Sequence, residues 1–139
     1  MSIIDLYDLF IHNPQITTDS RNCPKGSIFF ALKGDKFDGN QYAGKALASG
    51  CVYAVIDNPD YYIGERTILV DNVLKTLQQL AHHHRKVLGL PIIGITGTNG
   101  KTTTKELVGR VLSCKFRTAV TQGNLNNHIG VPLTLLAMT

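Results

Sequence analysis

One stretch in the last third of the chain restricts its possible folds more than any other. The apolar run 92–95 leads into a glycine-rich segment, and a Gly-Lys-Thr step at 100–102 then opens a helical pattern. The apolar face of that helix is formed by Leu107, Val108, Val111 and Leu112. A strand, a glycine-rich loop and a helix in this order are the setting of a phosphate-binding loop. The stretch therefore predicts an α/β domain that binds a nucleotide.

The residue types of this loop suit a chain of phosphates. Glycine lets the backbone approach phosphate oxygens closely, and converging N–H groups at a helix N-terminus attract anions. Lys101 is expected to reach the β- and γ-phosphates, and the hydroxyl of Thr102 to bind Mg²⁺.

The spacing departs from the general phosphate-loop pattern at one position. The pattern GxxxxGK[ST] requires its first glycine at position 95, which is Ile95 here, whereas Gly94 lies one residue earlier and Gly97 two residues later. A glycine-rich turn that binds no nucleotide is therefore the alternative. This alternative requires that packing alone explain the Gly-Lys-Thr step at a helix start.

The rest of the chain alternates between strand and helix patterns, which indicates an α/β fold. Strands are expected at 16–18, 27–32, 51–56, 68–70, 92–95 and 117–121. Helices are expected from Ser2, which forms a capping box with Asp5, and at 42–49 and 73–88, with Asp71 as cap of the last and Gly50 and Gly89 as helix ends. Pro91 starts a new segment, so we predict a small mixed α/β domain at 1–89 and the start of a parallel-sheet domain at 90–139.

Composition excludes several classes of protein. The 139 residues are 43% hydrophobic and 17% charged, which is too apolar for a disordered chain. The net charge of +4 is not clustered, so nucleic-acid binding is not favoured. The N-terminus lacks the basic region of a signal peptide, and no apolar run approaches the roughly 20 residues of a membrane span. Cys23, Cys51 and Cys114 form no CxxC pair and are interpreted as reduced, mostly packed thiols of a cytosolic protein.

Three polar clusters have competing interpretations. Ser20 and Arg21 follow a short strand, where they either contact a ligand or, for Arg21, only brace the loop against Asp19. Residues 124, 126 and 127 are asparagines, which either line a ligand or adopt the turn conformations that asparagine tolerates. The run 82–84 is three histidines, which point in different directions on a helix and so do not converge on one metal ion; His84 falls on the apolar face, with His82 and His83 outward.

The run Gly97-Thr98-Asn99-Gly100-Lys101-Thr102 resembles the ATP loop of the Mur ligase family, where the first glycine is displaced in the same way. The runs 18–21, 24–34 and 38–39 resemble the N-terminal UDP-sugar-binding domain of its members that add the third residue or the final dipeptide. The runs 103–106 and 123–136 are similar to the member that adds the dipeptide. The resemblance covers nearly the whole chain in family order.

This resemblance implies an ATP-dependent and Mg²⁺-dependent peptide ligase of peptidoglycan synthesis, located in the cytoplasm. Its substrates would be UDP-N-acetylmuramoyl-tripeptide (UDP-MurNAc-tripeptide) and D-Ala-D-Ala, joined through an acyl phosphate. The implied ATP-binding residues are Gly97, Thr98, Asn99, Gly100, Lys101, Thr102 and Thr103, with Lys101 catalytic and Thr102 a Mg²⁺ ligand. The implied substrate-binding residues are Ser20, Arg21, Asn124, Asn126 and Asn127.

Two other enzymes and one non-enzyme remain as alternatives. The ligase that adds the third residue has a similar front end, and folylpolyglutamate synthetases share the ATP loop but lack such a front domain. Because the family implies further magnesium ligands and a C-terminal domain, a fragment that binds ligands without turnover is the third alternative, and we expect this chain alone to be inactive. One position departs from the family pattern: Asn40 stands where His is often found after Asp38-Gly39.

Overall fold

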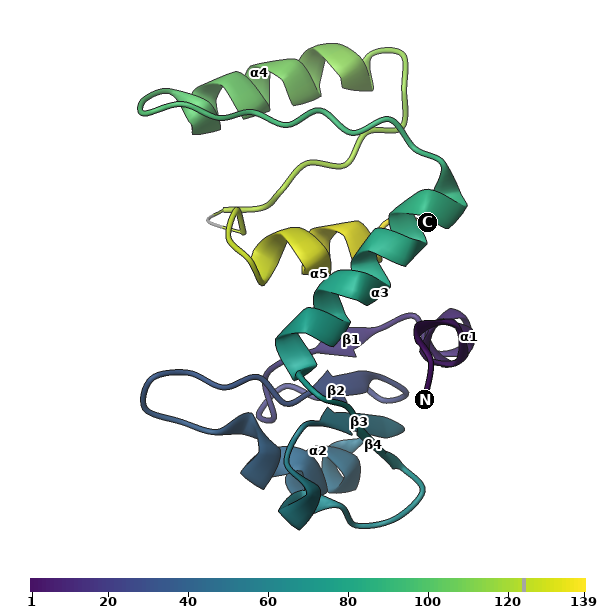
Figure 1. Cartoon of the computed structure of the whole chain (residues 1–139). Coiled ribbons are helices and arrows are strands. Elements are labelled where there is room, and N and C mark those ends of the chain that lie inside the picture. The colour runs from purple at the N-terminus through teal and green to yellow at the C-terminus, as the bar shows by residue number, and fades with distance from the viewer. Residues whose placement is uncertain (124) are drawn as a thin grey trace.

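The computed structural model describes residues 1–123 and 125–139 as a four-stranded sheet with helices on both faces and two further helices beyond it (Figure 1). The elements in chain order are α1 (Ile3–His12), β1 (Ile16–Thr17), β2 (Ile28–Phe30), η1 (Gly39–Tyr42), α2 (Ala43–Ser49), β3 (Tyr53–Ile56), η2 (Pro59–Tyr61), β4 (Thr67–Leu69), α3 (Val73–Leu88), α4 (Lys101–Ser113) and α5 (Gly130–Leu136). The predicted α/β class is confirmed.

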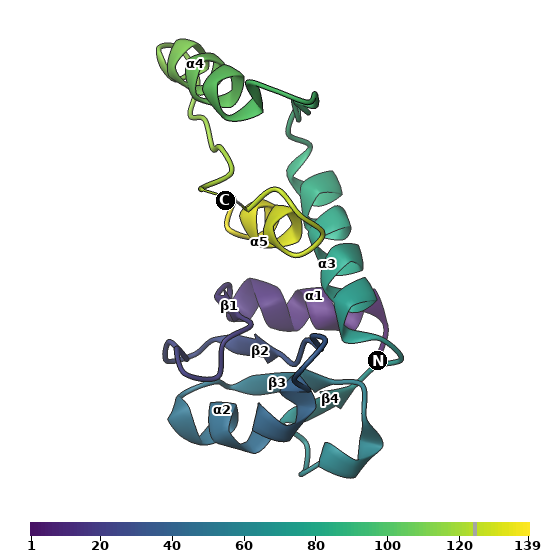
Figure 2. The same cartoon turned by 90° about the vertical axis from the view of Figure 1, so that its left-hand side faces the viewer.

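The sheet has the order β1-β2-β3-β4, and every neighbouring pair is parallel. Figure 2 shows α2 below the sheet and α1 above it. All four strands therefore end at the same edge, and the loops that follow them lie beside one another. In open parallel sheets this carboxyl edge is where ligands bind.

Alternate strand residues enter two separate cores. Ile28 and Phe30 pack with α1 and α3, whereas Phe29 and Ala54 pack on the opposite face with Ala46 of α2. Burial on both faces explains why these strands are continuous apolar runs rather than alternating ones.

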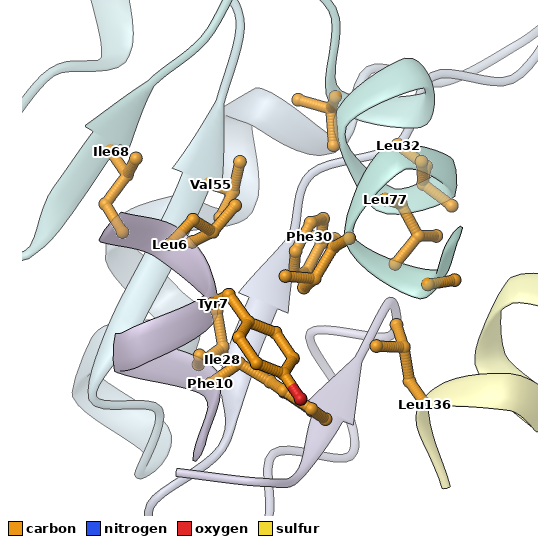
Figure 3. Packing of buried hydrophobic residues seen from close by; sticks show 13 residues of the cluster. Leu6, Tyr7, Phe10, Ile28, Phe30, Leu32, Val55, Ile68, Leu77 and Leu136 are labelled. Carbon is orange, nitrogen blue, oxygen red and sulfur yellow. The ribbon is translucent and has the colours of Figure 1, made fainter. Parts of the chain in front are cut away.

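The larger core extends beyond the sheet to α5. Leu136 of α5 is 3% exposed and packs in the same cluster as Phe10 and Leu77 (Figure 3). The side-chain amide of Gln78 also donates to the carbonyl of His128, 3.2 Å away. Residues close to the C-terminus thus pack on the N-terminal body, a contact that the sequence pattern did not predict.

Helix ends follow the local signals with one correction. The capping box of Ser2 and Asp5 is present, and Gly50 and Gly89 end α2 and α3 with φ of 132° and 62°. The prediction that Asp71 caps α3 is wrong. The cap is Asn72, whose side chain accepts the N–H of Lys75 at 2.8 Å, because it occupies the position directly before the first helical residue.

Two predicted strands are absent from the described residues. The apolar run 92–95 and the segment 117–121 are extended loops without ladder hydrogen bonds. A strand exists only through its partner, and neither segment lies against another strand. The remaining strands form where expected. β1, β2 and β3 are shorter than predicted, and β4 begins one residue earlier, at Thr67.

His84 is buried, as predicted, whereas the predictions for His83 and Cys114 are wrong. His84 is 5% exposed, but His83 is half-buried and its ring meets Tyr7 edge-on at 4.6 Å between centroids. Cys51 is buried, whereas Cys114 is exposed at the end of α4. Among the described residues, no helix has the length and apolar content to cross a membrane.

Candidate functional site

The phosphate-loop candidate connects α3 to α4. Gly97 and Gly100 have φ of 150° and 76°, and Gly100 stands directly before the first residue of α4. These values explain the glycines, since a side chain at either position would be strained. Lys101, Thr102 and Thr103 are exposed in the first turn of the helix. The structure therefore brings the predicted glycines and polar residues together at one helix N-terminus.

This helix end is open to a ligand. No side chain caps α4, and its first main-chain hydrogen bond runs from the N–H of Thr104 to the carbonyl of Gly100 at 2.9 Å. The preceding N–H groups have no partner within the helix, and they carry the positive end of its dipole. Together with the exposed ammonium of Lys101, they form a concentration of donors and positive charge suited to a polyphosphate.

The first turn of α4 is also tied to the segment 117–121. The ammonium of Lys105 donates to the carbonyl of Thr121 at 2.8 Å, and its side chain is 16% exposed. One turn later, a β-carbon on Gly109 would lie 2.8 Å from the side chain of Val120. This close approach requires a residue without a side chain. Lys105 was not predicted as a site residue, although its position four residues after Lys101 puts both on one helix face.

The asparagine loop begins directly after this segment. The side-chain oxygen of Asn127 accepts the N–H groups of Ile129 and Gly130 at 3.1 and 2.7 Å, so it organises the start of α5. Asn126 is exposed. Asn124 lies outside the described residues. The side-chain oxygen of Asn127 therefore has the turn-forming role. Its side-chain nitrogen takes no part in these two hydrogen bonds.

At the sheet, Ser20 and Arg21 follow β1 at the carboxyl edge. Ser20 is 9% exposed, and the guanidinium of Arg21 makes a two-pronged ion pair with Asp19 at 2.9 and 3.0 Å. The Arg21 hydrogen bonds hold the pKa of the Asp19 carboxyl below its usual value. The bracing alternative for Arg21 is thus seen, but its side chain remains 82% exposed with N–H groups free to bind elsewhere.

A second polar group at this edge was not predicted. Asp57, directly after β3, accepts the N–H of Val73 at 3.0 Å, the side-chain amide of Asn40 at 3.0 Å and the ammonium of Lys33 at 3.0 Å. Burial raises the pKa of Asp57, but these three donors outweigh burial and the net pKa is lowered. The sequence does contain a signal for this polar group. Lys33 and Asp57 are each the first polar residue after a buried apolar run.

Thr102 is the residue predicted to bind Mg²⁺. Among the described residues, no cluster of three or more His, Cys, Asp or Glu side chains is placed to hold a metal ion. Mg²⁺ typically takes one or two protein oxygens, with phosphate and water completing its shell. The exposed hydroxyl of Thr102 at the helix start fits the role of a single protein ligand.

Comparison with known proteins assigns both parts of the chain to one family. Residues 12–85 match the Mur ligase family, catalytic domain, and residues 95–139 match the Mur ligase middle domain. The chain belongs to the Mur ligase family. The predicted family is therefore confirmed over both parts of the sequence.

Two relatives within the Mur ligase family share one description. The UDP-N-acetylmuramoyl-tripeptide–D-alanyl-D-alanine ligase of Bacillus subtilis is 43% identical over 125 residues, which are 88% of this chain and 27% of that protein. The Escherichia coli protein of the same name is 37% identical over 124 residues, 89% of this chain and 27% of its own length. The chain thus spans less than a third of the curated relatives it matches.

Solved structures give the same result for the fold. A crystal structure of MurF from Acinetobacter baumannii superposes with a TM-score of 0.82 at 39% identity, covering 90% of this chain and 28% of that one. MurF ligase from Thermotoga maritima in complex with ADP superposes with a TM-score of 0.81 at 32% identity, covering 93% of this chain and 30% of that one.

Proposed function

We propose that this chain is part of the ligase that joins D-Ala-D-Ala to UDP-MurNAc-tripeptide in the cytoplasmic stage of peptidoglycan synthesis. The names of the relatives support the substrates, and the ADP complex of the Thermotoga maritima protein supports a nucleotide. The open N-terminus of α4, with exposed Lys101 directly after a glycine-rich loop, is the observation that carries the proposal.

The chemistry explains why ATP is required. A carboxylate does not accept an amine at neutral pH, because its oxygen is a poor leaving group. Transfer of the γ-phosphoryl group of ATP to the tripeptide carboxylate gives an acyl phosphate and ADP. The amine of D-Ala-D-Ala then attacks the acyl carbon, and inorganic phosphate leaves with the former carboxylate oxygen.

Positioning and charge neutralisation are the main contributions of a protein to phosphoryl transfer. The backbone N–H groups at 101–103 would hold the phosphates, and Lys101 would neutralise the charge that develops on the transferred group. Thr102 would hold Mg²⁺, which supplies further positive charge when bound. Gly97, Thr98, Asn99 and Gly100 would shape the loop so that its backbone approaches the phosphates.

Substrate contacts would come from two places. Ser20 and Arg21 at the carboxyl edge of the sheet would bind the UDP part, with the free N–H groups of Arg21 as donors. Asn126 and the amide nitrogen of Asn127 would face the reacting carboxylate or the γ-phosphate. Asn124 is included in this proposal from the sequence resemblance alone.

The proposal is tested by Lys101→Ala in a full-length ligase that carries this chain. Removing a preorganised charge partner typically lowers the rate by about 10²–10³-fold, so phosphate release with both substrates should fall at least this far. Lys115→Ala, two residues after the end of α4, is the control and should keep its rate. Near-normal turnover of Lys101→Ala would contradict the proposal. Replacing D-Ala-D-Ala by single amino acids separates this function from that of the ligase adding the third residue.

A further inference from the structure

The side chain at position 40 has no free hydrogen-bonding group. Asn40 is 1% exposed, and its side-chain nitrogen donates to Asp38 at 2.7 Å and to Asp57 at 3.0 Å. Its oxygen accepts the N–H groups of Asp57 and Asn58 at 2.9 and 3.2 Å. A primary amide has two N–H donors and two acceptor lone pairs, so all four are used within the protein. Asn40 therefore fastens the loop after β2 to the end of β3 and has nothing left to offer a substrate.

The same loop presents one charged group that is both held and accessible. The ammonium of Lys33 lies 3.0 Å from a carboxylate oxygen of Asp57, and the Lys33 side chain is 51% exposed while that of Asp57 is only 9% exposed. The pair uses one of the three N–H donors of the ammonium. Lys33 is thus restrained on the protein side and keeps donors directed to solvent.

Asp57 is itself fixed, which makes it a firm support for Lys33. Its second carboxylate oxygen accepts the N–H of Val73 at the start of α3, at 3.0 Å. One carboxylate therefore links the loops that follow β2, β3 and β4. The N–H groups of Val73 and Asn40 hold this carboxylate in place, and its hydrogen bond raises the pKa of Lys33, which keeps its positive charge.

We propose that Lys33 is the residue by which the loop after β2 contacts the diphosphate of a UDP-linked substrate, and that Asp57 positions it. The inference rests on the proposed function, which supplies a nucleoside diphosphate. Lysine binds phosphate as a point charge, and Lys33 stands at the carboxyl edge where open parallel sheets bind ligands. Asn40 of the same loop is buried and saturated, whereas Lys33 is exposed and keeps free donors.

The test measures binding of UDP and of uridine to the 139-residue chain by calorimetry and ligand-observed NMR. Lys33→Met should weaken UDP binding at least 10-fold and leave uridine binding unchanged, since uridine has no phosphate. Lys33→Arg should recover most of the loss, because it restores a positive charge at the same place. Lys36→Met is the matched control: Lys36 is an exposed lysine of the same turn, and its loss should change UDP binding less than twofold.

The outcomes separate this inference from the proposed function. If the unsubstituted chain binds UDP and Lys33→Met binds it equally well, the role of Lys33 is wrong and the proposed function stands. Equal losses in Lys33→Met and Lys36→Met would also overturn it, since they would show a general charge effect. If the folded, unsubstituted chain binds no UDP, the proposed substrate site in residues 1–89 is wrong, and the role of Lys33 falls with it.

Discussion

The hydroxyl of Tyr7 lies 3.1 Å from Nδ1 of the buried His84, whose Nε2 lies 2.8 Å from the carbonyl oxygen of Met138. A carbonyl only accepts hydrogen bonds, so Nε2 of His84 carries a proton, and in the neutral ring Nδ1 accepts a hydrogen bond from the hydroxyl of Tyr7. Three distant segments are thereby joined: α1, α3 and the residues after α5. The relay fixes the end of the chain on the N-terminal body.

Removing this hydroxyl should destabilise the fold. Tyr7→Phe leaves the buried Nδ1 of His84 without a donor, which typically costs about 1–3 kcal/mol of the free energy of unfolding. Urea unfolding measures the change. Tyr62→Phe is the control, since Tyr62 is 52% exposed and should unfold as the unsubstituted chain does. Equal stability of Tyr7→Phe and the unsubstituted chain would show that the relay contributes nothing.

Asp57 should make stability depend on pH in the acid range. Its pKa is lowered in the folded chain, so its contribution is present above the unfolded pKa of about 3.9 and is lost as pH falls through the folded value. Asp57→Asn should therefore be less stable by about 1–3 kcal/mol at pH 7, and the difference should shrink below pH 4. Urea unfolding at several pH values measures this. Asp35→Asn, in an exposed turn, is the control, and a difference for Asp57→Asn that is constant with pH would contradict the prediction.

Lys105 should hold the segment before the asparagine loop against α4. Lys105→Met removes the ammonium that donates to Thr121, and a hydrogen bond from a charged group is worth about 1.5–3 kcal/mol. Amide hydrogen exchange across 117–122 should accelerate by about 10-fold or more, as measured by mass spectrometry. Lys105→Arg should restore part of the protection, and Arg110→Met on the exposed side of α4 should not alter it. Unchanged exchange in Lys105→Met would mean that the contact with Val120 alone holds the segment.

Two glycines should respond in opposite directions to alanine. A β-carbon on Gly130 would lie 2.5 Å from the α-carbon of Leu125, which is backbone and has to move, so Gly130→Ala should cost about 1–3 kcal/mol. In α2, a β-carbon on Gly44 would meet only the side chain of Ile63 at 3.5 Å, so Gly44→Ala should stabilise by about 0.5 kcal/mol. Thermal and urea unfolding of both variants test the pair. Similar effects of the two substitutions would show that the approach of Leu125 to Gly130 is not tight.

Local chemistry was enough to predict most elements. The capping box of Ser2 and Asp5, the glycine at 89 and the Gly-Lys-Thr step act within a few residues, so their signals are written in the sequence itself. The runs at 27–32 and 51–56 are apolar on both faces because each strand is buried on both faces. The α/β class followed from these patterns, and the Mur ligase family from the resemblance of the runs at 18–21, 97–102 and 123–136.

Only the tertiary structure decided which side chains meet. Asp57 contacts Lys33, Asn40 and Val73, and His84 joins Tyr7 to Met138. These residues are far apart in the sequence, and hydrophobic periodicity does not indicate such contacts. The same reason explains why the strand predicted at 92–95 does not form. Apolar residues favour a strand, but only a neighbouring strand provides its hydrogen bonds. Sequence therefore determined the elements whose energy is local, and the fold determined the contacts whose energy depends on residues brought together from distant positions.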